Sequence, residues 1–326
     1  MGEWAHRCLR PGTRGQVVAR LTSTVYLQWD PGGIVWIAPE DSPFHRRALL
    51  TIDRLTHVEL GEGARIEGTA LAFEAGGRVE LSGSSVARAT RAVAEGESAG
   101  AGEIALRLAE LGRAAVMVDT PRGFGLFLPH LLRSNGIPRD EDGRAWKNPI
   151  LQFAWPIVHT LDSIALGKAP LSRLAEARSL IGLGPGLTPS GDDFLGGFLF
   201  VWHHLHQTFH WLPRPPSPRS LLRAESPRTN AISMALLRDL AYGEGVAPLH
   251  ELTAGILRGA PRQDSHGELK RLLQLGHSTG WDLFAGVIVG FGFSIRALSP
   301  RSSAALRPGI LPGRAIKGNH GHQTAH

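Results

Sequence analysis

Residues 182–193 restrict the possible folds of this chain more than any other segment. They contain four glycines, two hydroxyl residues and two adjacent aspartates, and they run directly into a strongly apolar stretch. Glycine allows positive φ angles and lets a ligand approach the main chain closely. Thr188 is a favourable N-cap and Pro189 a favourable first helical residue, so a helix is predicted to begin here with free N–H groups and a positive dipole end. We therefore expect a turn that opens a buried helix and can bind an anion.

A second segment, residues 276–282, repeats this order. When Ser190 is set beside Thr279, Ser-Gly-Asp-Asp-Phe-Leu-Gly-Gly aligns with Thr-Gly-Trp-Asp-Leu-Phe-Ala-Gly. Asp193 then matches Asp282, and both copies continue into three further apolar residues. The repeat predicts two similar turns, each followed by a buried helix.

Gly197 and Gly286 follow the matched aspartates by four residues, which places them on the same helical face. Because small residues let helices approach closely, the helices starting near Pro189 and Ser278 are predicted to pack through these two glycines. The alternative is coincidence, since helix N-termini commonly run from polar to apolar residues. We favour a duplicated helix-turn-helix unit whose turns face one pocket and whose matched aspartates are near neighbours.

The two adjacent aspartates of the first turn leave three interpretations open. Asp192 and Asp193 could hold Mg²⁺ beside a phosphate, or accept hydrogen bonds from the NH₂ group of a urea or carbamoyl compound. They could also only complement the dipole of the following helix. Buried acids need partners, so we favour a functional site at this turn.

The candidate site residues come from both turns and from a third helix start. We expect His277, Asp193 and Asp282 to carry the chemistry, although a capping role would explain His277 equally well. Arg228 can bind a carboxylate or phosphate through its guanidinium, and residues 122–125 are a weaker candidate for an anion-binding loop. The residues expected to bind substrate or phosphate are Gly184, Gly186, Thr188, Ser190, Gly191, Asp192, Ser278, Thr279, Gly280 and Arg228. The sequence has no arrangement typical of a covalent Ser or Cys nucleophile, and no Walker or dinucleotide motif.

The hydrophobic pattern divides the chain into three regions. Residues 1–100 contain short apolar runs separated by turns, which predicts a small antiparallel sheet or barrel. Residues 101–298 have the spacing of buried helices, including one long helix over 157–181. We therefore predict an α+β protein with an N-terminal β-rich domain and a mainly helical domain that carries the site. Residues 299–326 are expected to form a disordered tail.

Residues 208–228 contain five prolines. Proline removes a backbone donor and breaks a helix, so this segment is predicted to be a surface loop. An idle insertion and a lid over the site both remain open.

The amino-acid composition indicates which kind of ligand the protein binds. The net charge of +6, from 35 basic and 29 acidic residues, favours anionic ligands. The basic residues are scattered, with no zinc-finger spacing or basic helix, so a small anion is favoured over nucleic acid. The single cysteine, Cys8, excludes a disulfide framework. Because we find neither a signal peptide nor an apolar run long enough to span a membrane, we expect a cytoplasmic protein.

Residues 182–193 and 276–282 resemble the two strongest motifs of a bacterial family that includes the oxamate carbamoyltransferase subunit AllH. Residues 229–237 are similar to a weaker motif of that family. The resemblance covers residues 15–297 and is specific in the C-terminal half. Near the end of the first strand, where the family pattern has an asparagine, this chain has Tyr26.

The resemblance implies a transferase subunit that moves a carbamoyl group between carbamoyl phosphate and oxamate, with oxalurate and phosphate as products, in allantoin and purine catabolism. It also implies an oligomer with other carbamoyltransferase subunits. The glycines and hydroxyls of the first turn would bind the phosphate or the oxyanion, the three aspartates would orient the amide or Mg²⁺, and His277 would assist proton transfer. Such a transfer needs orientation rather than a covalent nucleophile. The alternatives are a non-catalytic ligand-binding partner subunit and a regulatory protein that binds a small anion.

Overall fold

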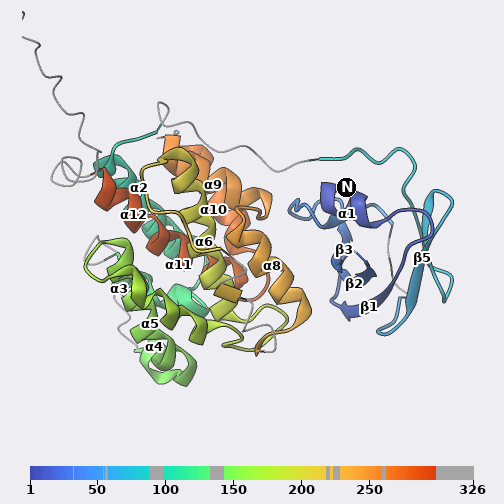
Figure 1. Ribbon diagram of the computed structural model, residues 1–326, viewed down its shortest axis with the longest axis horizontal. Helices are drawn as coiled ribbons and strands as arrows, with labels where there is room; N and C mark the ends of the chain where they lie inside the picture. Colours follow the sequence, from blue (N-terminus) through green and yellow to red (C-terminus); the bar gives the residue numbers. More distant parts are fainter. Residues whose placement is uncertain are drawn as a thin grey trace, which may run out of the picture.

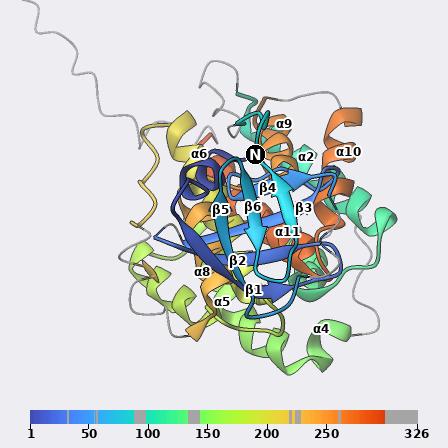
Figure 2. The same ribbon diagram turned by 90° about the vertical axis from the view of Figure 1, so that its right-hand side faces the viewer.

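The computed structural model describes residues 1–31, 33–53, 55, 58–87, 98–132, 143–217, 221–222, 228–258 and 262–298. Within them the chain forms an N-terminal sheet and a C-terminal group of helices, so the α+β prediction is confirmed (Figure 1). Figure 2 looks onto the sheet, with the helices behind it. No helix in these ranges is long and apolar enough to cross a bilayer. The tail predicted over 299–326 lies outside the described residues.

The N-terminal part is one seven-stranded sheet preceded by a short helix. The strand order is β4-β3-β2-β1-β5-β6-β7, and all neighbouring pairs are antiparallel except β3 and β4, which run parallel. The elements are α1 (Glu3–Cys8), β1 (Arg14–Arg20), β2 (Val25–Asp30), β3 (Gly33–Pro39), β4 (Ala48–Thr51), β5 (Gly63–Glu67), β6 (Ala70–Phe73) and β7 (Arg78–Glu80). The predicted antiparallel sheet is therefore confirmed apart from the parallel pair.

The two faces of this sheet have different partners. Alternation along β2 turns Val25, Leu27 and Trp29 into an apolar core that the sheet shares with α1. Tyr26 and Trp36 lie on the opposite face, where apolar side chains of the helical part pack against them. Burial on both faces explains why β3 is almost continuously apolar instead of alternating.

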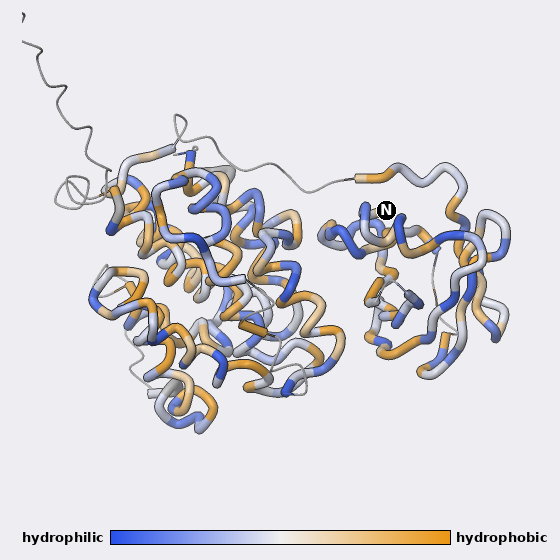
Figure 3. The backbone as a smooth tube through the Cα atoms, in the orientation of Figure 1, coloured by the Kyte–Doolittle hydropathy of each residue, from blue (hydrophilic) through white to orange (hydrophobic). Residues whose placement is uncertain are grey.

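The C-terminal part is built around two central helices, α6 (Ser190–Thr208) and α11 (Thr279–Gly290). Nearly every residue of both helices is buried. Hydrophobic residues run along the strands and through the inner helices in Figure 3. The surrounding elements are α2 (Ala101–Val118), η2 (Gly123–Phe127), α3 (Leu128–Leu131), α4 (Arg144–Lys147), α5 (Pro149–Ala165), η3 (Leu171–Leu180), α8 (Ala231–Ala241), α9 (Ala247–Arg258), α10 (Arg262–Leu273) and α12 (Gly292–Ala297).

The single long helix predicted over 157–181 is wrong. The α-helix α5 ends at Ala165, and a separate 3-10 helix, η3, occupies the second half of the predicted range. Gly167 between them adopts a left-handed φ of 71°, a conformation that commonly ends an α-helix. Pro170 then precedes η3 and cannot donate a helical hydrogen bond.

The described part of the proline-containing segment 208–228 packs at the C-terminal end of α6. The indole N–H of Trp202 donates to the carbonyl oxygen of Pro213 at 2.8 Å. This end of α6 is opposite to the first glycine turn. Residues 218–220 and 223–227 lie outside the described residues, so the choice between an idle insertion and a lid stays open.

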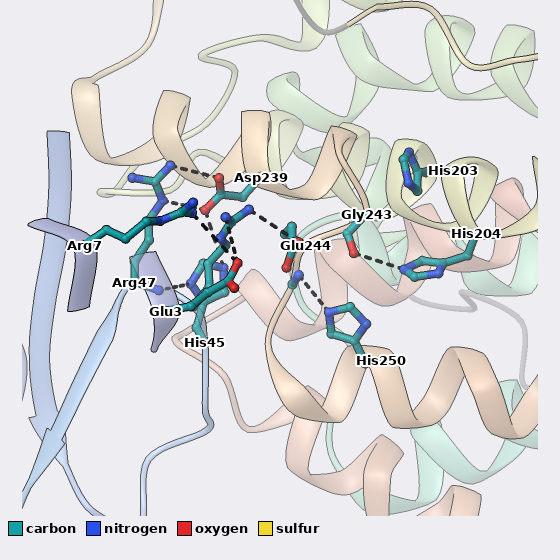
Figure 4. Close-up of polar contacts among 12 residues, drawn as sticks. Glu3, Arg7, His45, Arg47, His203, His204, Asp239, Gly243, Glu244 and His250 are labelled. Atoms are coloured by element: carbon teal, nitrogen blue, oxygen red, sulfur yellow. Dashed lines mark hydrogen bonds and ion pairs between the residues drawn. The ribbon is translucent and has the colours of Figure 1, made fainter. Parts of the chain in front are cut away.

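A buried ion pair joins the sheet to the helical part. Arg47, which precedes β4, donates from Nε and Nη2 to the two carboxylate oxygens of Asp239 on α8, at 2.5 and 2.8 Å (Figure 4). Its Nη1 donates to the carbonyl oxygen of Ile34 at 3.0 Å. His45 stacks on Trp36 beside the pair, and burial lowers the pKa of His45 to about 3, so its ring stays neutral. Charge and apolar contact together fix the two parts to each other.

We expect Arg47→Lys to lower the free energy of unfolding by about 2 kcal/mol, because an ammonium keeps the charge but cannot reproduce the two parallel hydrogen bonds to Asp239. Urea unfolding followed by circular dichroism measures this change. Arg65→Lys is the matched control, since the side chains of Arg65 and its partner Glu67 are 64% and 39% exposed and such surface pairs contribute at most about 1 kcal/mol. Equal, small losses in both variants would contradict a structural role for the buried pair.

Candidate functional site

The two predicted helices pack against each other through the two predicted glycines. A Cβ atom on Gly197 would lie 2.3 Å from the carbonyl oxygen of Leu283, and one on Gly286 would lie 2.1 Å from that of Phe194. Each glycine thus faces the residue that follows the aspartate of the other helix. The prediction that α6 and α11 pack through Gly197 and Gly286 is confirmed.

The main chain enters both helices in the same way. The Gly191 N–H donates to the carbonyl oxygen of Leu183 at 2.9 Å, and the Gly280 N–H donates to that of Leu275 at 3.1 Å. A Cβ on either glycine would meet a main-chain carbonyl oxygen at 2.0 Å. This shared geometry supports a duplication. It also means that these two N–H groups are already used within the protein, although both glycines were expected to bind an anion.

Hydroxyl groups join the two turns. The predicted N-cap is wrong by one residue, because α6 begins at Ser190 with Pro189 as its N-cap and no capping side chain. Proline has no N–H, so the helix can begin after it without leaving that donor unpaired. The hydroxyl of Thr188 pairs instead with that of Thr279 at 3.0 Å, and the Ser190 hydroxyl lies 3.4 Å from that of Ser278. The two turns therefore share one polar cluster.

Three glycines give the first turn its shape. Gly182, Gly184 and Gly186 have φ angles of 77°, 116° and 98°, which other residues rarely adopt. Gly184 lies against the start of α6, and Gly186 is exposed at the outside of the turn. The predicted glycine-dependent turn is present, with part of its main chain open to solvent.

Asp192 holds this turn to α8. Its Oδ1 accepts from the Gly182 N–H at 2.7 Å, and its Oδ2 accepts from the hydroxyls of Thr229 and Ser233, each at 2.5 Å. The residue is only 1% exposed. To bind Mg²⁺, this carboxylate would have to give up partners that hold the fold. Among the described residues, no group of three or more His, Cys, Asp or Glu side chains is placed to hold a metal ion.

Asp192→Asn is expected to lower the free energy of unfolding by about 1 to 2 kcal/mol, because a neutral amide loses the charge-assisted bonds to two hydroxyls. The measurement is urea unfolding at neutral pH. Asp53→Asn is the control, since Asp53 is exposed and accepts from the Thr51 hydroxyl at 3.0 Å. A destabilisation no larger than that of the control would mean that Asp192 does not hold the turn.

Asp193 lies in the hydroxyl cluster and is 4% exposed. Its Oδ2 atom is buried and has no hydrogen-bond partner within the described structure. Burial raises the pKa of Asp193 well above its ordinary value, and the negative charge of Asp282 raises it further. The hydroxyls of Thr279 and Thr188 oppose this shift. The charge of Asp282 thus acts on Asp193, as expected for matched aspartates that are near neighbours.

Asp282 is fully buried on the other side of the cluster. Its Oδ1 accepts from the Phe124 N–H at 2.6 Å, while its Oδ2 has no partner among the described residues. Burial raises the pKa of Asp282 to about 7, against the effects of Phe124 N–H and the hydroxyls of Ser278 and Ser190. The site thus contains two buried carboxyl groups, each with one oxygen that has no partner in the described part of the chain.

The candidate cations lie at the edge of the cluster. Arg122 donates to the main-chain oxygen of His277 at 3.2 Å and pairs with Asp119, also at 3.2 Å. The side chain of His277 is exposed. Arg228 is exposed as well, donates to the main-chain oxygen of Arg178 at 3.4 Å, and packs its own carbonyl against Gly182. Each turn therefore has one arginine at its rim.

Sequence reasoning missed two contributions to the site. Gly123 and Phe124 in η2 were considered only as part of a weak anion-binding loop, but they form the wall that holds Asp282. Tyr26 on β2 packs in the same apolar cluster as Leu187 of the first turn. Burial raises the pKa of Tyr26, and the charge of Asp193 adds to this rise. The signal for Tyr26 in the sequence was its position near the end of the first strand, where the family pattern has an asparagine.

A family model described as oxamate carbamoyltransferase subunit AllH matches residues 180–291. This range includes both turns, both matched aspartates and the whole of α6 and α11. No curated protein and no solved structure matches the chain. The match suggests a subunit of an oxamate carbamoyltransferase. It confirms the resemblance to the AllH family, and it does so over the helical segment that builds the two turns.

Proposed function

We propose that this chain is a carbamoyltransferase subunit that binds carbamoyl phosphate and an acceptor such as oxamate at the paired turns. The observation that carries the proposal is the pair of buried carboxyl groups, Asp193 and Asp282, each with an oxygen that has no partner in the described structure. Unpaired buried acceptors are costly, so a ligand that supplies N–H donors is favoured there. The match to the AllH family supports the same chemistry.

A carbamoyl group suits this pair because its NH₂ presents two donors. The amide nitrogen of oxamate attacks the carbamoyl carbon, the C–O bond to phosphate breaks, and the attacking nitrogen loses one proton. A carboxyl group that titrates near neutrality can take that proton, and burial raises the pKa of Asp282 to about 7. Asp193 then orients the amide, and the burial of both groups strengthens these interactions.

The phosphate is proposed to lie toward the rim. Arg122 and Arg228 stand beside the second and first turns; Arg228 is exposed, and the side chain of Arg122 is 38% exposed. Arginine suits phosphate because its planar guanidinium can form two parallel hydrogen bonds. In this proposal His277, which is exposed and whose main-chain oxygen accepts from Arg122, gives a proton to the departing phosphate. The buried carboxyls would thus face the carbamoyl end and the rim would face the phosphate end.

Thermal unfolding of the purified chain with carbamoyl phosphate, inorganic phosphate or oxamate tests the proposal. A ligand at a hundredfold excess over its Kd stabilises the folded state by about 2.7 kcal/mol. We expect carbamoyl phosphate to raise the Tm more than phosphate does, and Asp193→Asn to abolish the difference. Asp53→Asn, which changes an exposed aspartate, should keep the full response. No shift with any ligand at millimolar concentration would contradict the proposal.

A non-catalytic, ligand-binding partner subunit is the second candidate. The observation that favours it is the position of the two rim arginines at the surface, where Arg228 is exposed and the side chain of Arg122 is 38% exposed, so that another chain could reach the phosphate end. Turnover assays on the chain alone and with the other carbamoyltransferase subunits separate the two functions. Binding without turnover by the chain alone, and turnover only when the other subunits are present, would assign the chemistry to other chains. Binding of phosphate alone, with indifference to the carbamoyl group, would favour a regulatory anion sensor.

A further inference from the structure

A cavity of about 460 Å³ lies between the sheet and α8. Gln28 on β2 and Ile34 on β3 line it on one side, and residues of α8 line it on the other. None of the described residues in its walls belongs to the paired turns. Sites for small molecules commonly have volumes of roughly 300 to 1,000 Å³. A ligand in this cavity would therefore contact both parts of the chain at a place distinct from the turns.

Arginine dominates the charge of the walls. Arg46, Arg47 and Arg238 line the cavity, and Asp239 is the single acid among the described residues that line it. The two oxygens of Asp239 already accept from Arg47 at 2.5 and 2.8 Å, and the remaining Nη1 of Arg47 donates to a main-chain oxygen at 3.0 Å. Because this pair is complete, Asp239 does not neutralise the other two arginines. The cavity thus favours an anion over a cation.

Two side chains of the walls each keep one buried N–H donor without an acceptor. The indole N–H of Trp4 and the Nε–H of Arg46 have no hydrogen-bond partner in the described structure. The other two nitrogens of Arg46 lie 3.1 Å from a carboxylate oxygen of Glu3 and 3.4 Å from one of Glu244, and its guanidinium lies over the Trp4 ring. Buried donors without acceptors are costly, so an oxygen-bearing ligand is favoured beside this wall.

Arg238 supplies the opposite side of the cavity with a free positive charge. It is exposed on the last turn of α8, and its guanidinium has no ion-pair partner in the described part of the chain. We propose that the cavity is a second ligand site, and that it binds a small anion with phosphate or carboxylate oxygens between Arg238 and the wall formed by Trp4 and Arg46. A guanidinium suits such oxygens because its N–H groups can form two parallel hydrogen bonds.

This site does not rest on the proposed function, but α8 connects it to the paired turns. The hydroxyl of Ser233 on α8 donates to Asp192, which holds the first turn. A ligand bound to Arg238 would contact the same helix, two turns further along. The anion would therefore bind to the helix that fixes the first turn in place.

Chemical modification measures the occupancy of the cavity at a single residue. Phenylglyoxal reacts with accessible guanidinium groups, and mass spectrometry of the peptides gives the rate at each arginine. We expect inorganic phosphate or succinate at millimolar concentration to slow the modification of Arg238 severalfold, and the comparison distinguishes a phosphate from a carboxylate ligand. Arg14, which is exposed on β1 and also has no ion pair within the described residues, should keep its rate. Equal protection of both arginines, or none of Arg238, would overturn the inference.

Calorimetry with the anion that protects Arg238, either inorganic phosphate or succinate, tests the affinity. Because anions are also proposed to bind at the rim of the turns, the titrated chain carries Arg122→Gln and Arg228→Gln. We expect the added change Arg238→Gln to weaken binding about tenfold, the size of one charge-assisted hydrogen bond, and the matched control Arg14→Gln to leave it unchanged. Unchanged affinity in Arg238→Gln would overturn the inference. Failure of the wild type to bind carbamoyl phosphate would contradict the proposed function alone.

Discussion

Gly286→Ala is expected to lower the free energy of unfolding by about 3 to 5 kcal/mol. The added Cβ would lie 2.1 Å from the carbonyl oxygen of Phe194 and 2.8 Å from the nitrogen of Phe198, both of which are main-chain atoms of α6. A side chain could rotate away from such a contact, but a helix backbone cannot, so α6 and α11 must separate. Because both aspartates sit at the ends of these helices, the same change should weaken the response to carbamoyl phosphate. Urea unfolding and thermal shift measure the two effects.

Gly267→Ala is the matched control for this change. Gly267 lies in α10, it is exposed, and a Cβ there would meet no atom within 4 Å. Alanine at such a site stabilises a helix by up to about 1 kcal/mol. Gly197→Ala should behave like Gly286→Ala, since its Cβ would lie 2.3 Å from the carbonyl oxygen of Leu283. If Gly286→Ala were as harmless as the control, the close contact of the two helices would be refuted.

The helix pair could be predicted from the sequence because its determinants are local and occur twice. The order of hydroxyl, glycine and aspartate marks each helix start, and a glycine four residues after each aspartate marks the contact. The N-cap at Thr188 was wrong because a threonine hydroxyl can cap its own helix or bond elsewhere with equal ease. Its partner, Thr279, is 91 residues away along the chain. Local preference could not decide between these two hydrogen bonds.

The roles of the aspartates depended on contacts that no local pattern contains. Asp192 and Asp193 are neighbours in the sequence, yet Asp192 is saturated by Gly182, Thr229 and Ser233 while Asp193 keeps an unpartnered oxygen. The difference follows from the 100° step between successive residues of a helix, which turns one side chain to α8 and the other to α11. Only the positions of the neighbouring helices determine which of the two aspartates is hydrogen-bonded within the protein.

Asp282→Asn is expected to stabilise the protein above neutral pH and to abolish its response to carbamoyl phosphate. The pKa of Asp282 is raised to about 7 by burial, from an ordinary value of 3.8, so the folded state binds this proton more tightly than the unfolded state does. The stability that Asp282 contributes is therefore fully present below pH 3.8 and is lost as the pH rises through 7. At about 1.4 kcal/mol per pKa unit, the ionised group costs roughly 4 kcal/mol at pH 8.

Asparagine removes this cost because it never ionises. Its amide oxygen can still accept from the Phe124 N–H, and its NH₂ takes the place of the unpartnered Oδ2. The gain in unfolding free energy should therefore be largest at pH 8, smaller at pH 5 and absent near pH 3, while the exposed control Asp53→Asn should show no such dependence. Asp193 should also become easier to ionise, because the like charge beside it is gone.

A variant less stable than wild type at pH 8 would mean that a cation compensates the Asp282 carboxylate. If the variant is more stable but no longer binds carbamoyl phosphate, Asp282 is needed for ligand binding even though it lowers the free energy of unfolding.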